Sequence, residues 1–334
     1  MGARTSFLPY SAALLLGGCA AERPQSILDP AGPIAEHITG LWWEMFAVYG
    51  AVFLVTLLLV VLALAARKRE RTVLGTRFVF IAGIVVPTVI LVFMLYRELD
   101  VHRSITRHTH DFHVQVIGHG WWFEVRYPDH GLVDANEIHV PAGTTVLFEL
   151  SAESMLHSFW VPRLGGKRDQ LPDHPGELRL DVTRAGVYHG VCTEYCAGQH
   201  ARMGFRLVAH EPDEFDIWLA RRSAAPPEPD DPWLQRGRDV FQGGGCASCH
   251  AIRGISEADT GPDLTHVGSR RTLGAGSLEN SRGVLAGWIA DPQSLKPRVR
   301  MDFILINPEP IQIRQSAHSR INLTINSIFI LTII

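Results

Sequence analysis

The sequence predicts a membrane-anchored, multidomain protein with an N-terminal hairpin of two transmembrane helices, an all-β Greek-key barrel and an all-α C-terminal domain. Two long apolar runs near the N-terminus predict the hairpin. Short strand-like segments separated by Pro, Gly, Asn and Asp predict the β domain. A Pro-rich, acidic linker separates these parts from a helix-like segment that precedes the motif Cys-x-x-Cys-His.

Composition limits the classes of function. The 334 residues have room for two or three domains, and a 46% hydrophobic content is slightly high for a soluble protein. The net charge of −3 comes without a basic run interleaved with aromatic residues, which predicts no nucleic-acid partner. No nucleophile–base arrangement indicates hydrolysis, so membrane and redox chemistry carry the signal.

Residues 1–19 are expected to form an export signal. They contain Arg4, a short apolar run and the sequence Leu-Gly-Gly before Cys19, which is similar to a bacterial lipoprotein signal whose cysteine becomes lipidated. An uncleaved signal or a plain leader with a chance cysteine is the alternative.

Residues 35–100 are expected to form the transmembrane hairpin. The apolar runs 41–66 and 78–96 would span about 39 Å and about 28 Å as helices. The basic stretch 67–71 between them belongs in the cytoplasm, which places both termini outside. A buried hairpin of a soluble protein is the alternative.

Two residues inside these runs carry their own expectations. Glu44 is costly against lipid, so it is expected to face a partner helix, with a position among the lipid headgroups as the alternative. Pro87 is expected to kink the second helix without ending it.

Residues 101–222 are expected to form the β domain. Regularly spaced strand candidates separated by turns favour a Greek-key sandwich or barrel. The strand candidates are residues 112–117, 121–126, 137–140, 144–150, 178–182, 187–191 and 204–208.

A loop of this domain concentrates soft metal ligands. Cys192, Cys196, His200 and Met203 follow the pattern Cys-x3-Cys-x3-His-x2-Met. Thiolate and thioether groups favour copper(I), zinc or iron–sulfur clusters, and a Met ligand favours an electron-transfer copper. Two thiolates can bridge two copper ions, for which His157 would supply a further nitrogen. A Cys192–Cys196 disulfide is the alternative.

These residues resemble the binuclear copper (CuA) site of cytochrome c oxidase subunit II. The resemblance implies a cupredoxin-like barrel in which two cysteines bridge the coppers and a backbone carbonyl completes the ligand shell. It also implies that the Glu194 side chain helps hold magnesium at the contact with subunit I. Carried over by motif, the ligands are His157, Cys192, Glu194 through its carbonyl, Cys196, His200 and Met203.

The aromatic stretch 118–127 is similar to the subunit II segment between the copper site and the docking surface for cytochrome c. By match, Trp121 is the electron-entry residue. The family often has Trp where this chain has Phe123. Ordinary core packing is the alternative for Trp122 and Phe123.

Residues 223–232 are expected to be a linker and residues 233–301 a haem domain. Cys246, Cys249 and His250 form Cys-x-x-Cys-His, the attachment signature of c-type haem. A redox disulfide or half of a zinc site is the alternative. Residues 261–264 and 288–297 are similar to class I cytochrome c, in which a later Met is the second iron ligand. Met301 is the candidate.

The resemblance stops after Met301. Residues 302–334 are rich in Ile, lack Gly and show no capped helical stripe. We therefore expect an incomplete cytochrome c domain followed by an atypical tail, which a frameshift or mis-assembled end would explain.

The resemblance, which covers about 35–301, implies subunit II of a proton-pumping haem–copper cytochrome c oxidase with a fused haem c domain. Electrons would pass from a donor cytochrome c through haem c and copper to the oxygen-reducing site of subunit I. Subunit III is a further expected partner. The chain would cross a bacterial plasma membrane twice, with its soluble domains on the periplasmic side.

Three alternatives belong to other functions. A nitric oxide reductase subunit could use the same copper module. A disulfide-stapled, membrane-anchored β domain that only binds a partner would hold no metal. A quinol oxidase subunit is disfavoured because that branch lacks the copper ligands.

Overall fold

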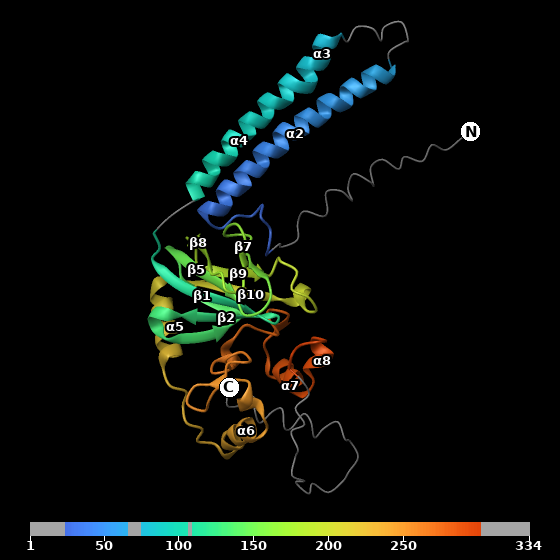
Figure 1. The fold of residues 1–334 in the computed structure, drawn as a ribbon. Helices are drawn as coiled ribbons and strands as arrows, with labels where there is room; N and C mark the ends of the chain where they lie inside the picture. The colour runs from blue at the N-terminus through green and yellow to red at the C-terminus, as the bar shows by residue number, and fades with distance from the viewer. Residues whose placement is uncertain (1–23, 66–74, 106–108, 302–334) are drawn as a thin grey trace, which may run out of the picture.

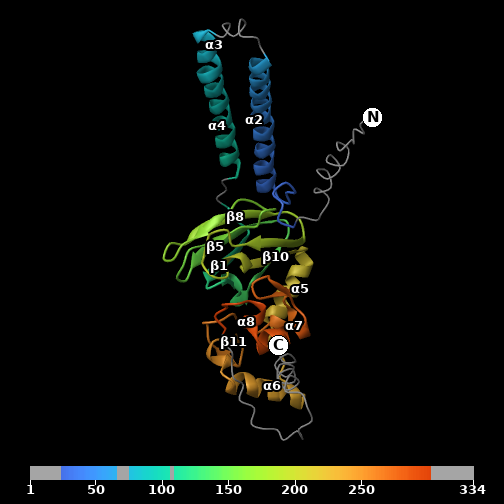
Figure 2. The same cartoon turned by 90° about the vertical axis from the view of Figure 1, so that its right-hand side faces the viewer.

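The computed structural model describes residues 24–65, 75–105 and 109–301. The helical hairpin projects from one end of the β domain, and the C-terminal domain lies at the opposite end (Figures 1 and 2). The expected signal with Cys19, the basic stretch 67–71 and the tail 302–334 lie outside the described residues.

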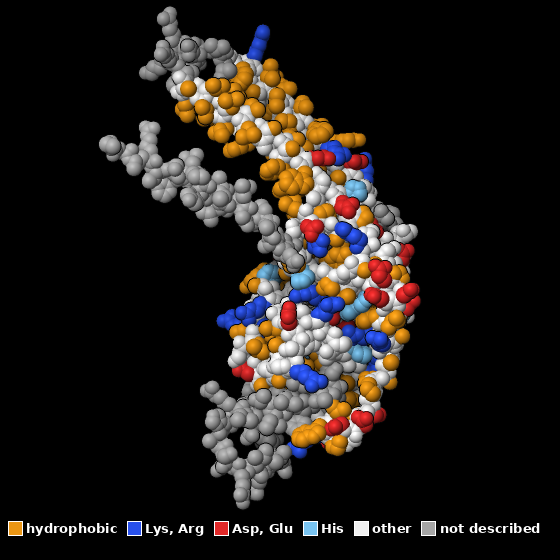
Figure 3. All heavy atoms as spheres, turned by 180° about the vertical axis from the view of Figure 1, so that it is seen from behind, with side chains coloured by type: hydrophobic (Ala, Val, Ile, Leu, Met, Phe, Trp, Pro, Cys, Tyr) orange, Lys and Arg blue, Asp and Glu red, His pale blue; other side chains and the backbone are white. Residues whose placement is uncertain are grey.

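The hairpin consists of α2 (Pro33–Ala65) and of a second helix made of α3 (Thr76–Phe80), the π-helical η3 (Ile81–Val85) and α4 (Val86–Ile105). Both have the length and apolar composition to cross a membrane, and 0% and 6% of their most apolar windows are buried. Apolar side chains cover most of the hairpin face that is seen in Figure 3. Because neither helix is buried in a core, the hairpin anchors the protein in a membrane.

Pro87 does not end the second helix, as expected. The proline ring clashes with the carbonyl of residue i−4, which here is Gly83. The segment around that carbonyl adopts the wider η3 turn before α4 continues. The distortion is therefore absorbed within the helix.

Glu44 of α2 faces the neighbouring helix, as predicted. Its two carboxylate oxygens accept hydrogen bonds of 2.9 and 2.7 Å from Arg97 of α4. Such a bidentate pair satisfies both charged groups and fixes the rotation of the two helices.

The β domain is built from two main sheets, with strand orders β3-β2-β1-β5-β8 and β4-β10-β9, and a small β6-β7 ladder. All predicted strands are confirmed. The short strands β3, β6 and β7 are additions, since a few residues show no clear alternation. The strands are β1 (Phe112–His119), β2 (Trp122–Tyr127), β3 (Leu132–Ala135), β4 (Glu137–Pro141), β5 (Thr144–Ala152), β6 (His157–Phe159), β7 (Arg168–Gln170), β8 (Gly176–Val182), β9 (Gly186–Val191) and β10 (Gly204–His210).

Aromatic rings fill the space between the two sheets. Phe205 of β10 packs against Phe123 and Phe159 with ring centroids 5.1 and 4.7 Å apart, and Phe148 lies 5.0 Å from Phe159. These four rings are fully buried. Such ring pairs stabilise the core of the barrel in addition to the burial of apolar surface.

The helix α5 (Pro212–Ser223) follows β10 and was not predicted from the sequence. Phe215 is buried, and Trp218 stacks on His139 of β4 with centroids 4.4 Å apart. The helix therefore covers the outside of the smaller sheet, and its last turn carries Arg222, whose carbonyl lies 3.1 Å from His266 of the C-terminal domain.

The C-terminal domain is helical, with two ladders of very short strands in its loops. Its helices begin at side-chain caps, because Asp231, Ser281 and Asp291 accept hydrogen bonds from the first-turn amides of α6, α7 and α8. Its elements are α6 (Pro232–Gly243), η6 (Cys246–Ser248), β11 (Ala251–Ile252), β12 (Ser256–Glu257), η7 (Val267–Ser269), β13 (Thr272–Leu273), β14 (Leu278–Glu279), α7 (Arg282–Ala290) and α8 (Pro292–Leu295).

A buried charge cluster joins the C-terminal domain to the β domain. Asp134 of β3 accepts a 2.8 Å hydrogen bond from Arg270, and Arg222 lies 3.4 Å from its other oxygen. Burial by itself raises the pKa of Asp134, but Arg270 and Arg222 outweigh burial and hold it below its usual range. The cluster's contribution is therefore present at neutral pH and is lost as pH falls below about 4.

Substitution Asp134→Asn should destabilise the protein by about 3–5 kcal/mol, because it leaves two buried guanidinium groups without their carboxylate. Urea unfolding of the detergent-solubilised chain measures the loss. Asp129→Asn, at an exposed acid, is the control and should change stability by less than about 0.5 kcal/mol. Equal stabilities of the two variants would contradict the role of the cluster.

Candidate metal centre

The soft ligands predicted from the sequence meet at one end of the β domain. Cys192 Sγ and Cys196 Sγ lie 3.9 Å apart, and His157 Nδ1 lies 3.9 Å from Cys192 Sγ. His200 Nδ1 and Met203 Sδ lie 3.6 and 3.8 Å from Cys196 Sγ. The structure therefore brings together two thiols, two imidazoles and one thioether.

The carbonyl of Glu194 belongs to the same cluster. It lies 3.3 Å from Cys192 Sγ, inside the turn that connects the two cysteines. All six predicted ligand positions thus converge. Together they offer two imidazoles, two thiols, one thioether and one carbonyl oxygen. This donor set fits soft, redox-active copper better than a structural zinc site.

The two cysteines are free thiols. Their sulfur atoms are 3.9 Å apart, which is about twice the length of a disulfide bond. The hydrogen bond between them lowers the pKa of Cys192 and raises the pKa of Cys196. One thiolate therefore forms readily, and the pair can bind a cation by releasing its protons.

Neighbouring strands hold His157 in place. The residue is 0% exposed on β6, and its Nε2 has no hydrogen-bond partner among the described residues. Its ring lies directly over Gly118 of β1, where a Cβ would stand 2.7 Å from the imidazole. Gly118 therefore makes the space that the ring needs.

The segment 192–203, which we call the metal loop, contains a residue in the left-handed backbone conformation. Ala197 has φ of 67°, which is unfavourable for a residue with a side chain. The loop ends in the turn η5 (His200–Arg202), and the amide of Cys192 donates to the carbonyl of Met203 at 2.9 Å. This backbone hydrogen bond joins the first and last ligand residues of the loop.

Trp121 contacts the metal loop directly. Its indole Nε1 donates a 2.7 Å hydrogen bond to the carbonyl of Cys196. Its ring lies against Gly198, where a Cβ would be 3.0 Å away. Trp121 itself has φ of 71° in the turn between β1 and β2, a strained conformation that these contacts stabilise.

Phe123 is fully buried, and its ring lies 6.4 Å from that of His157. Trp122 instead stacks on His119 with centroids 4.3 Å apart. Both rings therefore pack against side chains of the β domain, and a role of either ring in electron transfer stays a prediction.

The Cys-x-x-Cys-His motif lies at the start of the C-terminal domain. Cys246 is buried in η6 and Cys249 is exposed, and both are free thiols. His250 Nδ1 donates a 2.8 Å hydrogen bond to the carbonyl of Pro262, which leaves Nε2 as the unprotonated atom. Burial lowers the pKa of His250, so the imidazole is neutral and can bind iron.

The surroundings of His250 fit a bound ring system. A Cβ at Gly261 would lie 2.6 Å from the imidazole, so this glycine allows the chain to pass close to the histidine. Phe241 and Ile252 form an apolar cluster with Cys246. Apolar walls, two thiols and an oriented histidine are the features that c-type haem requires.

Met301 is the last described residue of the C-terminal domain. The amide of Gln293 donates to its carbonyl at 3.0 Å, which ties its backbone to α8. Its role as an iron ligand stays a prediction.

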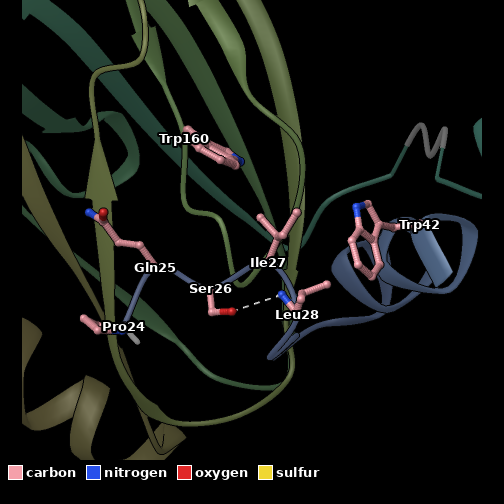
Figure 4. Close-up of a pocket in the computed structure, with 7 residues that line it drawn as sticks. All are labelled: Pro24, Gln25, Ser26, Ile27, Leu28, Trp42 and Trp160. Carbon is pink, nitrogen blue, oxygen red and sulfur yellow. Dashed lines mark hydrogen bonds between the residues drawn. The ribbon is translucent and has the colours of Figure 1, made fainter. Parts of the chain in front are cut away.

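A shallow apolar hollow lies apart from both centres, where the segment 24–28 approaches Trp42 of α2 and Trp160 (Figure 4). No titratable side chain lines it. The hollow is therefore not a candidate site for acid–base chemistry.

Sequence reasoning missed the residues that connect the two domains. Asp134, Arg270 and Lys296 are all buried at the seam, which is the contact between the β domain and the C-terminal domain. An isolated charged residue carries no sequence signal of burial. The one available hint was that Lys296 stands within the segment similar to cytochrome c.

Substitution Gly118→Ala should lower copper affinity by about 10–100-fold, because the added methyl group displaces the His157 ring. Copper titration of the metal-free chain measures the change. Gly166→Ala is the matched control, since a Cβ there meets nothing within 4 Å. Equal affinities in the two variants would show that His157 is not a ligand.

Comparison with family models identifies both soluble domains. Residues 130–209 match the family model described as the periplasmic domain of cytochrome c oxidase subunit II, and residues 234–309 match the cytochrome c model. A solved structure of the periplasmic domain of subunit II of cytochrome oxidase from Bradyrhizobium japonicum is similar, with a TM-score of 0.34 and 22% identity, over 35% of this chain and 96% of that one.

Longer similarities come from curated relatives. Cytochrome c oxidase subunit 2 of Alkalihalophilus pseudofirmus is 35% identical over 307 residues, which is 87% of this chain and 89% of the relative. The subunit 2 of Bacillus subtilis is 30% identical over 317 residues, 86% of this chain and 88% of the relative. Since both matches extend over most of each protein, this chain belongs to the cytochrome c oxidase subunit 2 family.

Proposed function

We propose that this chain is the electron-transfer subunit of a terminal respiratory oxidase. Electrons from a donor cytochrome c enter through the C-terminal domain, continue to the β domain, and pass to the oxygen-reducing partner, subunit I. The chain itself performs no oxygen chemistry. The observation that carries the proposal is the convergence of two free thiols, two imidazoles and a thioether beside a docked domain with a Cys-x-x-Cys-His motif.

The β domain would hold binuclear copper. Cys192 and Cys196 would bridge the two ions, His157 and His200 would each supply a nitrogen, and Met203 and the Glu194 carbonyl would complete the shell. Bound there, copper supplies reversible one-electron exchange. The buried strands on either side keep the ligands in one arrangement during each cycle, which minimises reorganisation.

The C-terminal domain would hold haem c. Cys246 and Cys249 would form the thioether links, His250 would be one axial ligand and Met301 the other. A Met–His ligand pair raises the reduction potential of haem, which suits a carrier that accepts electrons from a donor cytochrome. The Pro262 carbonyl fixes the orientation of His250.

Trp121 is the proposed point of electron entry to the copper loop. What supports this role is its hydrogen bond to the carbonyl of Cys196, which joins the indole to the backbone of a ligand. Arg300 of the C-terminal domain lies over the same ring, 5.9 Å from its centroid. Trp121 is thus in contact with both domains.

The proposed domain limits are 1–19 for the signal, 35–100 for the hairpin, 101–222 for the β domain, 223–232 for the linker and 233–301 for the haem domain. They are supported by α2 beginning at Pro33 and α6 at Pro232. The hairpin would cross a bacterial plasma membrane twice, with the soluble domains in the periplasm. The chain would pack on subunit I and lie near subunit III.

The Glu194 carboxylate would also help hold magnesium at the contact with subunit I. Its present neighbour is Lys167, 3.7 Å away, which also lies 3.5 Å from Asp169. These two acids thus share one counter-ion on the same surface, where a divalent cation would be attracted by both.

Cys196→Ser should abolish the electron paramagnetic resonance signal of two coppers that share one unpaired electron, since serine does not bridge copper as thiolate does. The same variant should keep its haem absorption. Cys249→Ser is the reciprocal control and should lose one haem thioether bond while the copper signal persists. Survival of the copper signal in Cys196→Ser would refute the bridging role.

The purified complex should consume oxygen when it is supplied with reduced cytochrome c. Nitric oxide consumption in place of oxygen uptake would instead identify the chain as a nitric oxide reductase subunit with the same copper module. An oxygen electrode and a nitric oxide electrode on the same preparation separate the two.

A further inference from the structure

Lys296 lies where the C-terminal domain meets the metal loop. It is 2% exposed, although a lysine is rarely buried without a carboxylate partner. Among the described residues no carboxylate lies within 4.0 Å of its ammonium group. Burial lowers the pKa of Lys296 to about 8, so the group still carries its charge at neutral pH.

Three backbone carbonyls take the place of a counter-ion. Lys296 Nζ donates to the carbonyls of Arg202 and Gly274, each at 2.9 Å, and to that of Trp121 at 3.4 Å. These acceptors belong to three separate segments, namely the end of the metal loop, the β13–β14 turn and the β1–β2 turn. A single ammonium group therefore joins both domains at their contact.

Among the three acceptors, the Trp121 carbonyl belongs to a residue with a strained backbone. Trp121 has φ of 71°, a left-handed conformation that is unfavourable for a residue with a side chain, so neighbouring groups must hold the turn in this shape. Lys296 holds its carbonyl, and the Cys196 carbonyl holds its indole. Both halves of the residue are thus fixed by hydrogen bonds.

The segment after Lys296 extends the same contact. Arg300 lies over the Trp121 ring, and a Cβ at Gly120 would stand 2.9 Å from its guanidinium carbon. The absence of a side chain at Gly120 therefore admits Arg300 to this position. Since Met301 follows directly, the segment from Lys296 to Met301 connects the haem domain to Trp121.

Further contacts in the same seam involve groups beside Lys296. Gln199 of the metal loop donates to the carbonyl of Pro297, and Arg202 Nη1 donates to that of Leu295 at 3.2 Å. The metal loop thus contacts the residues on both sides of Lys296. Of these contacts, only the Lys296 ammonium lies buried and bonded to three segments at once.

We propose that Lys296 is the positioning residue that holds the haem domain against Trp121 and the copper loop, and so keeps the interdomain electron-transfer distance short. This inference rests on the proposed function, in which electrons pass from the C-terminal domain to the β domain. Lys296 acts through the carbonyls that it holds and itself carries no electron.

The test measures electron transfer between the domains in the assembled, metal-loaded complex. A laser-triggered photoreductant reduces the haem, and its reoxidation is followed in the visible region while copper reduction is followed in the near infrared. Lys296→Met keeps the apolar stem and removes the donor. It should slow the transfer at least about tenfold, since losing charge-assisted hydrogen bonds shifts the docking equilibrium by such a factor.

Arg298→Gln is the matched control, because it removes a cation from the same segment at an exposed side chain. It should leave the rate unchanged. Lys296→Gln, which keeps a neutral donor, should give an intermediate rate and serves if Lys296→Met does not fold. The copper resonance signal and the haem spectrum should be those of the parent in every variant. A parental rate in either folded Lys296 variant overturns the proposal.

A second measurement does not depend on the bound metals. In the metal-free chain, amide hydrogen exchange of residues 119–122, 200–203 and 272–276 should be faster in Lys296→Met and unchanged in Arg298→Gln. Unchanged exchange in all three segments of Lys296→Met contradicts the positioning role. If the parent complex itself shows no transfer between the domains, the proposed function fails, and hydrogen exchange alone decides the role of Lys296.

Discussion

Two buried thiols that are held apart from one another are the constraint on which the rest of this structure depends. Cys192 and Cys196 remain 3.9 Å apart because the turn between them and the hydrogen bond from Trp121 to the Cys196 carbonyl fix the loop. A disulfide would leave neither sulfur free to bind a metal ion. The sheets, the buried His157 and the left-handed loop residues all serve to keep this spacing.

The second requirement is a fixed contact between the soluble domains. Asp134 with its two arginines closes one part of the seam, and Lys296 closes the part beside the metal loop. Both devices bury charge, which costs desolvation free energy unless every charged group is bonded. The cost is offset here by the hydrogen bond between Arg270 and Asp134 and by the three carbonyls that accept from Lys296, and these contacts hold the two domains against one another. Electron transfer depends steeply on distance, so such a contact has functional value.

The three parts of the described chain are arranged one after another. The hairpin lies at one end, the β domain in the middle and the C-terminal domain at the far end (Figures 1 and 2). In the function proposed above, this order would leave the C-terminal domain away from the membrane, where a mobile donor could reach it. The Glu44–Arg97 pair fixes the hairpin, and the core rings fix the barrel on which the metal loop stands.

The sequence by itself determined the hairpin, the main strands, the metal loop and the Cys-x-x-Cys-His motif. These features are local: apolar length, alternation and ligand spacing are written within short stretches of chain. Only the tertiary structure decided that His157 would lie over Gly118, that α5 would cover the small sheet, and that Lys296 would be buried at the seam. Those contacts join segments far apart in the chain, and the burial of a lone charge depends on what folds over it.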